Sequence, residues 1–337
     1  MGGATSKIES INQDLTGKHF IVTGANTGLG YVTSRELAKM GAKVTMACRS
    51  ESKGIAAMEK IRQEALEKPV KEGVALLAGL EDVDINLELL DLGSLQSVTD
   101  FAKRFKASDS KVDVLVNNAG IMAMPERKET VDGFEMQIGV NHFGPHLLTR
   151  LMEPSIKDGG RVVFLSSLGH KQPPGHPMTT LDWDNVNFDK ADPYTPFKAR
   201  FAYGRSKLAN ILDAKEFAKH LAPRGIITYA AHPGIVNTEL MRNMTDNSLF
   251  SRTTRVLAPI SPYLLATPLT GALTQIRCAI DPTLGKPELS GKYWGKMQEE
   301  QCSELASDPA NPPRYWKLTE DLLETKLGKK IDDLIAE

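Results

Sequence analysis

The stretch Lys18 to Gly30, KHFIVTGANTGLG, joins a short apolar run to a glycine-rich turn and the start of a helix. His19 to Thr23 is predicted to be a buried strand, and helical spacing follows from about Leu29. The order of strand, glycine turn and helix is the context that a dinucleotide-binding site requires. An ordinary tight turn is the alternative for a glycine motif taken alone.

Each glycine of the turn has its own expected task. Gly24 allows a tight turn, Gly28 lets the backbone approach a pyrophosphate, and Gly30 lets the helix pack closely on the strand. The N–H groups at the helix N-terminus would then face the phosphates. The residues expected to contact the cofactor here are Gly24, Asn26, Thr27, Gly28, Leu29 and Gly30.

The composition is that of an ordinary globular protein. The 337 residues are 41% hydrophobic, with 41 basic and 42 acidic side chains. No basic stripe stands out, so we expect no nucleic-acid partner. Three scattered cysteines form no disulfide framework and no zinc spacing, which favours a reducing, cytoplasmic location. The longest charge-free run, Val256 to Ile276, is broken by prolines, so we expect no transmembrane segment.

Predicted strands alternate with helices along the chain. Strands are expected at 19–23, 43–47, 84–90, 112–116, 160–167, 226–231 and 292–294. This alternation predicts right-handed βαβ units and a parallel sheet. The predicted fold is therefore α/β, a Rossmann-type doubly wound parallel sheet with helices on both faces. A single domain at 17–297 would follow a flexible arm at 1–16 and precede a C-terminal extension at 298–337 with a helix at 320–327.

Three segments depart from the regular alternation. Residues 67–82 show no clear period and are expected to be an insertion. Residues 169–200 form a long loop rich in Pro and Asp, of a kind that is usually functional or poorly ordered. Residues 238–280 contain helical pieces and are expected to cover the substrate. The apolar stretch at 249–273 favours a hydrophobic substrate, although its apolar face could equally belong to the core.

The ends of the second and third predicted strands indicate the cofactor. Arg49 follows the second strand, where an acidic residue would bind the ribose 2′-OH of NAD, and an arginine can instead pair with the 2′-phosphate of NADP. This favours NADP(H), with a solvated surface charge as the alternative. Asp91, followed by Leu92, could accept a hydrogen bond from the adenine amino group or cap the next helix.

Ser167, Tyr203 and Lys207 carry the expected chemistry. Tyr203 and Lys207 are four residues apart in a predicted helix, so both project from one face. A phenol with a pKa of about 10 is a poor acid–base catalyst at neutral pH, and a nearby ammonium would lower that pKa. Ser167, at the end of a strand, could bond a substrate oxygen as charge develops on it. The glycine turn upstream makes this interpretation preferable to a chance surface pair.

Six motifs together resemble the short-chain dehydrogenase/reductase family. They are TGANTGLG at 23–30, NNAG at 117–120, Asn141, SS at 166–167, YGRSK at 203–207 and HPGIVNT at 232–238. The motifs follow the family's order and span most of the first 240 residues. The wording ACR at 47–49 and YGRSKLAN at 203–210 is most similar to the retinol dehydrogenase branch, with its WW-domain oxidoreductase and protochlorophyllide-reductase relatives.

The resemblance implies a role for each matching residue. Tyr203 would be the proton donor, and Lys207 its partner and a ligand of the ribose. Ser167 would orient the oxyanion, Ser166 would be structural, and Asn141 would hold a proton-relay water. Besides Tyr203 and Lys207, the expected cofactor contacts are Asn118, Ala119, Gly120, Pro233, Gly234, Val236 and Thr238.

The predicted function is that of an NADP(H)-dependent oxidoreductase that interconverts a carbonyl and an alcohol on a hydrophobic or aromatic small molecule. In the reduction, hydride would pass from C4 of the nicotinamide while Tyr203 protonates the oxygen. The alternative is a catalytically silent NADP(H)-binding regulatory or scaffold protein, which would be expected to lose the tyrosine or the lysine. The oligomeric state stays open.

Two features depart from the family pattern. Ser167 and Tyr203 are 36 positions apart, more than in compact members, so the intervening loop could shape the substrate mouth. We also expect no N-terminal membrane anchor of the kind that many retinol-active members carry, which weakens the case for retinol itself. No metal site is expected: His142 and His146 have helical spacing, but they lack an H-E-x-x-H motif and fit the start of a helix.

The N-terminus generates a testable prediction. Residues 1–6, MGGATS, match the N-myristoylation pattern with Gly2 as the acceptor. One myristoyl chain gives only marginal, reversible membrane binding. We expect the chain isolated from its native cell to carry one acyl group and to partition weakly to membranes, and Gly2→Ala to abolish both. An intact mass without the acyl addition would contradict this.

Overall fold

Eight strands form one twisted sheet in the order β3-β2-β1-β4-β5-β6-β7-β8, and every neighbouring pair is parallel except β7 with β8. The computed structural model describes residues 4–66, 82–122, 124, 126–171, 185–188, 195–236 and 266–337. The strands are β1 (His19–Thr23), β2 (Lys43–Cys48), β3 (Ile85–Leu89), β4 (Val112–Asn117), β5 (Ile156–Leu165), β6 (Ile227–His232), β7 (Lys292–Gly295) and β8 (Gln298–Glu299). The doubly wound α/β prediction is confirmed.

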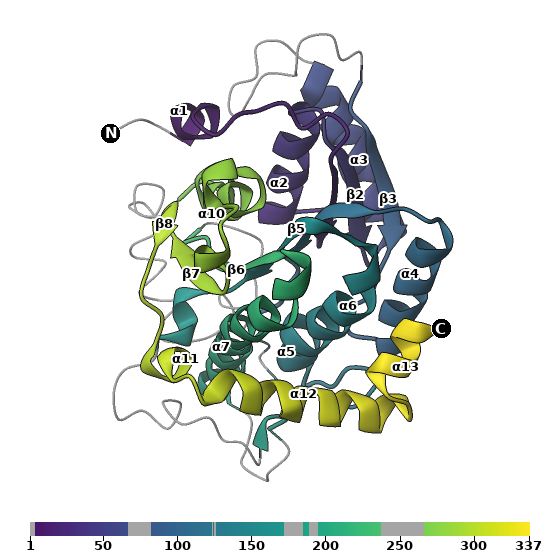
Figure 1. The fold of residues 1–337 in the computed structure, drawn as a ribbon, viewed down its shortest axis with the longest axis vertical. Helices are drawn as coiled ribbons and strands as arrows, with labels where there is room; N and C mark the ends of the chain where they lie inside the picture. The colour runs from purple at the N-terminus through teal and green to yellow at the C-terminus, as the bar shows by residue number, and fades with distance from the viewer. Residues whose placement is uncertain are drawn as a thin grey trace.

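Helices cover both faces of the sheet (Figure 1). One face carries α1 (Ala4–Glu9), α2 (Gly28–Lys39), α3 (Glu51–Leu66) and α10 (Pro268–Ile280). The other carries α4 (Leu95–Ala107), α5 (Met136–Ile138), the π-helical turn η1 (Gly139–Phe143), α6 (Gly144–Met152), α7 (Pro196–His220), α12 (Asn311–Leu327) and α13 (Ile331–Ala336). Short helical turns include η3 (Leu168–His170) and α11 (Glu304–Ser307). Within these described ranges, no helix has the length and apolar composition needed to cross a membrane.

The strands read as apolar runs because each is buried on both faces. All five residues of β1 are buried. Successive side chains point to opposite faces of a strand, so Ile21 joins the core beneath α4, α6 and α7 while Phe20 and Val22 join the core beneath α2 and α10. The central strand therefore anchors both helical layers.

The N-terminal segment differs from the expected flexible arm at 1–16. Residues 4–9 form α1, and Ile8 is fully buried against the core beneath α10. The Nε2 amide of Gln13 donates to the carbonyl oxygen of Ile280 at 2.6 Å, and the N–H of Leu15 donates to the carbonyl oxygen of Met40 at 2.8 Å. The segment is mostly polar in composition, so the sequence did not indicate that Ile8 and Leu15 are buried in the core and hold the segment in place.

The helix of the C-terminal extension is longer than the one expected at 320–327, and it packs into the core. Helix α12 begins nine residues earlier, with two prolines in its first turn, and ends at Gly328, whose φ is 64°. Proline is favoured at a helix start and glycine just past a helix end. Tyr315 and Leu323 are buried in the same core as α7, so the extension completes that layer.

A buried cluster of charged side chains joins the extension to the rest of this layer. Asp213 lies on α7. Its Oδ1 is 3.0 Å from His146 Nδ1, and its Oδ2 is 3.2 Å from His142 Nδ1. His142 Nε2 also contacts Thr319 Oγ1 of α12 at 3.0 Å, and His146 Nε2 lies 3.9 Å from Glu320 Oε1. The two histidines are thus fully buried partners of a carboxylate rather than simple helix-start residues.

The protonation of this cluster follows from its pairing. Burial opposes charge on His146, but the carboxylates of Asp213 and Glu320 outweigh burial and raise the pKa of His146 to about 9. Burial likewise opposes charge on Asp213, but the two histidines outweigh it and lower the pKa of that carboxyl to about 2. A charged His146–Asp213 pair therefore exists over the whole neutral range.

We predict that stability declines on the alkaline side. A histidine with a pKa of about 6.5 in the unfolded chain and about 9 in the folded chain contributes fully below pH 6.5, and this contribution is lost as pH rises through 9. His146→Gln cannot charge, so its free energy of unfolding should be lower near neutrality and should change less between these two pH values. Denaturant titrations at several pH values measure this.

His220→Gln is the control, because His220 is a half-exposed histidine paired with Glu153 at 3.1 Å. It should keep the alkaline decline of the unaltered chain. An identical decline in His146→Gln would show that the buried pair does not cause the pH dependence.

Candidate functional site

A cavity of about 520 Å³ opens where the strand order reverses, between the carboxyl ends of β1 and β4. This is the place where open α/β sheets bind ligands. The predicted site residues that line it are Gly24, Asn26, Thr27, Gly28, Leu29, Arg49, Asp91, Leu92, Asn118, Ala119, Gly120, Tyr203, Lys207 and Pro233. The structure thus brings most of the predicted contacts into one cavity.

The turn after β1 needs glycine for space as well as for backbone angles. Gly24 has a φ of 64°, and a Cβ on it would lie 2.9 Å from the Cα of Ala119. A Cβ on Gly30 would lie 2.5 Å from Asn118 Nδ2, so Gly30 packs the turn and does not line the cavity. A Cβ on Gly120 would lie 3.2 Å from both Asn141 Oδ1 and Lys207 Nζ. Glycine at these positions therefore lets the turn after β1 and the turn after β4 pack closely together.

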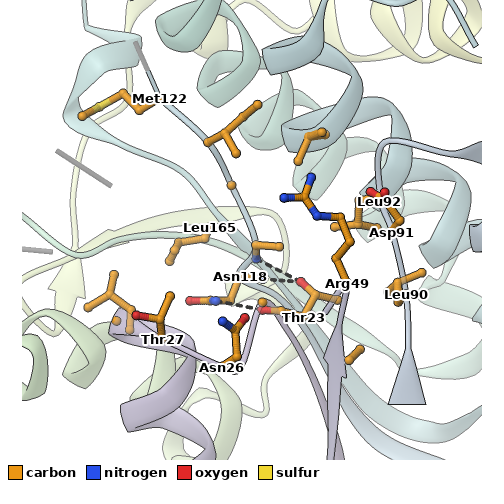
Figure 2. A pocket seen from close by; sticks show the side chains of 18 of the residues that line it. Thr23, Asn26, Thr27, Arg49, Leu90, Asp91, Leu92, Asn118, Met122 and Leu165 are labelled. Atoms are coloured by element: carbon orange, nitrogen blue, oxygen red, sulfur yellow. Dashed lines mark hydrogen bonds between the residues drawn. The ribbon is translucent and has the colours of Figure 1, made fainter. Parts of the chain in front are cut away.

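Thr23 and Asn118 lock the ends of β1 and β4 together. Thr23 Oγ1 accepts from the backbone N–H groups of Asn118 and Ala119, both at 3.0 Å, and Asn118 Nδ2 donates to the Thr23 carbonyl oxygen at 2.8 Å. Figure 2 shows these bonds at the base of the cavity. Thr23 was absent from the predicted site, although its place as the last residue of the strand before the glycine turn could have indicated it.

The N-terminus of α2 faces the cavity without a side-chain cap. Thr27 occupies the N-cap position in an extended conformation, and its side chain makes no capping bond. At α4 and α10, by contrast, Ser94 and Thr267 cap their helices. The first N–H groups of α2 are therefore suited to bind an anion such as a phosphate.

A cationic group borders the far end of the cavity. Arg49 follows β2 as predicted, and Ser50 and Lys53 at the start of α3 line the cavity with it. Figure 2 shows Arg49 reaching over the same part of the cavity as Asp91 and Leu92. Lys53 was missed, and its spacing of four residues from Arg49 at a predicted helix start was the available signal.

Asp91 lines the cavity and does not cap α4. Its Oδ1 accepts from the N–H of Gly93 at 2.9 Å, whereas Ser94 accepts from Ser97 and is the N-cap. Of the two alternatives that the sequence left open, helix capping belongs to Ser94. The Asp91 carboxylate is left at the cavity wall.

Tyr203 and Lys207 line the other end of the cavity, and Ser167 lies beside Tyr203 without lining the cavity itself. A Cβ on Gly169 would lie 3.5 Å from both Ser167 Oγ and the Tyr203 ring, which places these two side chains together. Lys207 Nζ lies 5.7 Å from the centre of the Tyr203 ring and donates to the carbonyl oxygen of Leu165 at 2.9 Å. Ser166 Oγ donates to the Lys207 carbonyl oxygen at 2.7 Å and so ties β5 to α7.

The electrostatics of this group differ from the sequence expectation. Burial raises the pKa of Tyr203, and a hydrogen bond with Ser167 only partly offsets this. Burial also lowers the pKa of Lys207 to about 7. The ammonium was expected to lower the phenol pKa, but burial is the largest cause of the shift at both groups. The protein by itself therefore keeps the phenol protonated at neutral pH.

Asn141 lies behind the cavity in the π-helical turn η1. Its Oδ1 accepts from the N–H of Ile121 at 2.8 Å, and its Nδ2 donates to the Ile121 carbonyl oxygen at 2.9 Å and to Ser206 Oγ at 3.0 Å. These bonds fix the backbone of Ile121, which lines the cavity. The structure therefore assigns Asn141 a supporting contact, and a water relay through it stays a prediction.

Other predicted residues do not line the cavity or lie outside the described residues. Gly234 and Val236 follow β6 without lining the cavity, and Val236 pairs with Ala266 in an isolated bridge. Thr238, Gly2 and most of the predicted insertion, loop and covering segment lie outside the described residues. The lining residues that the sequence did not indicate are Thr23, Ala47, Ser50, Lys53, Leu90, Ile121, Met122, Val140, Leu165 and Ser166.

The described residues contain no group of three or more His, Cys, Asp or Glu side chains that could hold a metal ion.

Comparison with known proteins places the chain among dehydrogenases. The profile of the family described as short chain dehydrogenase matches residues 18–178. Retinol dehydrogenase 12 of Mus musculus is 36% identical over 314 residues, which cover 93% of this chain and 88% of that protein. Retinol dehydrogenase 13 of Homo sapiens is 37% identical over 305 residues, which cover 90% of this chain and 83% of that protein.

Solved structures show the same fold. An uncharacterized protein from Mycobacterium paratuberculosis has 31% identity and a TM-score of 0.67, with 94% of this chain and 96% of that chain covered. A protein from Beutenbergia cavernae, described as an NAD(P)-dependent gluconate 5-dehydrogenase and holding NADP at low occupancy, has 22% identity and a TM-score of 0.56. This second likeness covers 84% of this chain and 96% of that chain.

We predict that the cationic end of the cavity selects the phosphorylated cofactor. A hydrogen bond to a charged partner contributes about 1.5–3 kcal/mol, which is roughly a tenfold to hundredfold change in affinity. Arg49→Asp should therefore weaken NADPH binding by at least about tenfold while leaving NADH binding similar, and Lys53→Gln should act in the same direction. Fluorescence titration with both cofactors measures this.

Lys60→Gln is the matched control, because Lys60 lies on the same helix but outside the cavity, over the Tyr31 ring at 5.3 Å. Equal affinity of the unaltered chain for NADPH and NADH would refute the assignment of Arg49 and Lys53.

Proposed function

This chain belongs to the short-chain dehydrogenase family, in its retinol dehydrogenase-like branch, and from this premise we propose that it is an NADP(H)-dependent oxidoreductase. It would interconvert a carbonyl and an alcohol on a hydrophobic or aromatic small molecule. The observation that carries the proposal is that Tyr203 and Lys207 line the same cavity as the glycine turn, with Ser167 beside Tyr203.

The residues of the cavity fit a dinucleotide. Gly24 lets the turn approach Ala119, a Cβ on Gly120 would crowd Lys207 Nζ, and the uncapped N-terminus of α2 offers N–H groups to a pyrophosphate. Arg49 and Lys53 would hold a 2′-phosphate, and Asp91 would accept from the adenine amino group. Gly234, Val236 and Thr238 would close over the nicotinamide end. When bound, the nicotinamide supplies or accepts the hydride.

The side chains of the protein manage the proton. A raised pKa keeps Tyr203 protonated at neutral pH, so the phenol holds a proton that a developing alkoxide, which is a stronger base than a phenolate, would accept. Ser167 donates a hydrogen bond to the same substrate oxygen, which strengthens as charge develops there. Lys207, with a pKa of about 7, is positioned to hold a ribose hydroxyl and to exchange a proton near neutrality. We propose that Asn141 supports this exchange through a bound water.

The substrate end of the cavity is apolar. Ile121, Met122 and Leu165 line the cavity, and these side chains offer no strong hydrogen-bond partner for a sugar. A hydrophobic or aromatic carbonyl compound fits these walls better than a polyol. The relatives named retinol dehydrogenase point in the same direction, toward an apolar alcohol.

The alternative of a catalytically silent NADP(H)-binding scaffold is less well supported. A scaffold has no need of a tyrosine and a lysine that line one cavity with a serine beside the tyrosine. We further propose a cytoplasmic protein that contacts membranes only through an acyl group on Gly2.

Tyr203→Phe tests the proposed function. The change removes one oxygen and keeps the ring, so NADPH affinity should change little while turnover falls by about 10²–10⁴-fold, the usual effect of losing a positioned acid–base group. Ser167→Ala should resemble it, and Lys207→Ala should damage both cofactor binding and turnover. Steady-state rates on a panel of aldehydes and ketones, with cofactor titrations alongside, measure these effects.

Near-full turnover in Tyr203→Phe would show that these three residues are not the catalytic apparatus. An unaltered chain that binds NADPH but turns over no carbonyl or alcohol of the panel would favour the scaffold.

A further inference from the structure

His170 lies three residues after Ser167 and is hydrogen-bonded to its carbonyl oxygen. Its Nδ1 lies 2.6 Å from the carbonyl oxygen of Ser167, and the backbone N–H of His170 donates to the same oxygen at 3.2 Å. A carbonyl oxygen only accepts hydrogen bonds, so Nδ1 must carry the proton. Two donors of one residue therefore hold the peptide group of Ser167.

The other ring nitrogen of His170 is held by the C-terminal extension. The backbone N–H of Ser303 donates to His170 Nε2 at 3.1 Å, across 133 positions of sequence. An N–H donor requires a lone pair on Nε2, so the ring is neutral with its proton on Nδ1. The two bonds thus select a single tautomer and a single ring orientation.

The surroundings of the ring favour the same neutral state. His170 is 3% exposed, and its ring lies 4.8 Å from that of Tyr293. Burial is the largest cause that lowers the pKa of His170 to about 4. Lys171 and His232 lower it further, while the Ser167 carbonyl and Glu300 act in the opposite direction. The ring therefore stays uncharged throughout the pH range in which the chain would work.

Two contacts hold the Ser167 hydroxyl in place. Ser167 Oγ accepts from the N–H of Gly169 at 3.1 Å, and the same side chain hydrogen-bonds with Tyr203. A positioned donor of this kind acts only while the backbone beneath it stays in place, because a displacement of about 1 Å can cost 10²-fold in rate.

We propose that His170 is a positioning residue that orients Ser167, and that Ser303 of the C-terminal extension holds His170 in the tautomer which this task requires. The proposal rests on the proposed function, since it assigns Ser167 to the reaction. Under this proposal the C-terminal extension contributes to the core and also orients Ser167 through His170.

Two substitutions at His170 separate its two bonds. The amide nitrogen of an asparagine falls close to Nδ1, so His170→Asn keeps a donor to Ser167. The amide oxygen of a glutamine falls close to Nε2, so His170→Gln keeps an acceptor for Ser303 and loses the donor to Ser167. We expect kcat to fall about tenfold to a hundredfold in His170→Gln and His170→Ala, with partial rescue in His170→Asn and an unchanged dissociation constant for NADPH.

Two substitutions at Ser303 provide a matched pair. Ser303 caps α11 through its hydroxyl and has a φ of −65°, which proline adopts without strain. Ser303→Ala and Ser303→Pro both remove the cap, but only Ser303→Pro removes the N–H that reaches His170. We expect a lower kcat in Ser303→Pro than in Ser303→Ala at a similar melting temperature.

The tautomer is read directly by nitrogen NMR of the chain with isotope-labelled histidine. We expect the proton of His170 on Nδ1 in the unaltered chain, and loss of this single form in Ser303→Pro. A proton on Nε2 in the unaltered chain would overturn the proposal even if the chain turned over no substrate. Normal turnover in the unaltered chain together with equal kcat in His170→Gln would overturn it while leaving the proposed function intact.

Discussion

The contact between Thr23 and Asn118 is the constraint on which the site depends. It joins the carboxyl ends of β1 and β4 by three hydrogen bonds, two onto Thr23 Oγ1 and one onto the Thr23 carbonyl oxygen. From β1 the chain continues to β2 and β3 on one side, and from β4 it continues to β5 and β6 on the other side. The helices that follow β1 and β4 therefore cover opposite faces of the sheet. The cavity exists because nothing fills the space between these two exits, and the close approach of the two turns explains why glycine and alanine are found there.

A second constraint is the burial of charge on the face covered by α7. Lys207, Asp213 and His146 are all buried in this layer, and burial penalises every one of them as an ion. The layer resolves the penalty in two ways. Asp213 and His146 remain charged because they pair with each other. Lys207 donates to a carbonyl oxygen, and burial lowers its pKa to about 7. Helix α7 therefore carries both a carboxylate that is fixed in an ion pair and an amine whose pKa lies near neutrality.

Much of the fold and of the site could be predicted from the sequence. Strands buried on both faces give continuous apolar runs such as HFIVT, and the glycine turn, Arg49 and the Tyr203–Lys207 spacing are local patterns that the structure places in one cavity. What could not be predicted depends on contacts between distant segments. Ile8, which fixes the N-terminal helix, and Thr319, which meets His142, are unremarkable residues until the fold brings their partners near. The pKa of Tyr203 was also wrongly predicted, because burial is a property of the packed layer and not of the four-residue spacing.

The integration of the C-terminal extension has a consequence for how the chain is made. Proteins are synthesised from the N-terminus, and their segments begin to fold in that order. Thr319 and Glu320, which contact the buried histidines, follow α7 in the chain and so leave the ribosome after it. Until they emerge, α7 and the turn that carries Asn141 cover a charge cluster that lacks the contacts of α12. A chain cut short before α12 would therefore present to proteases and chaperones a molecule with its glycine turn formed and its buried histidines uncovered.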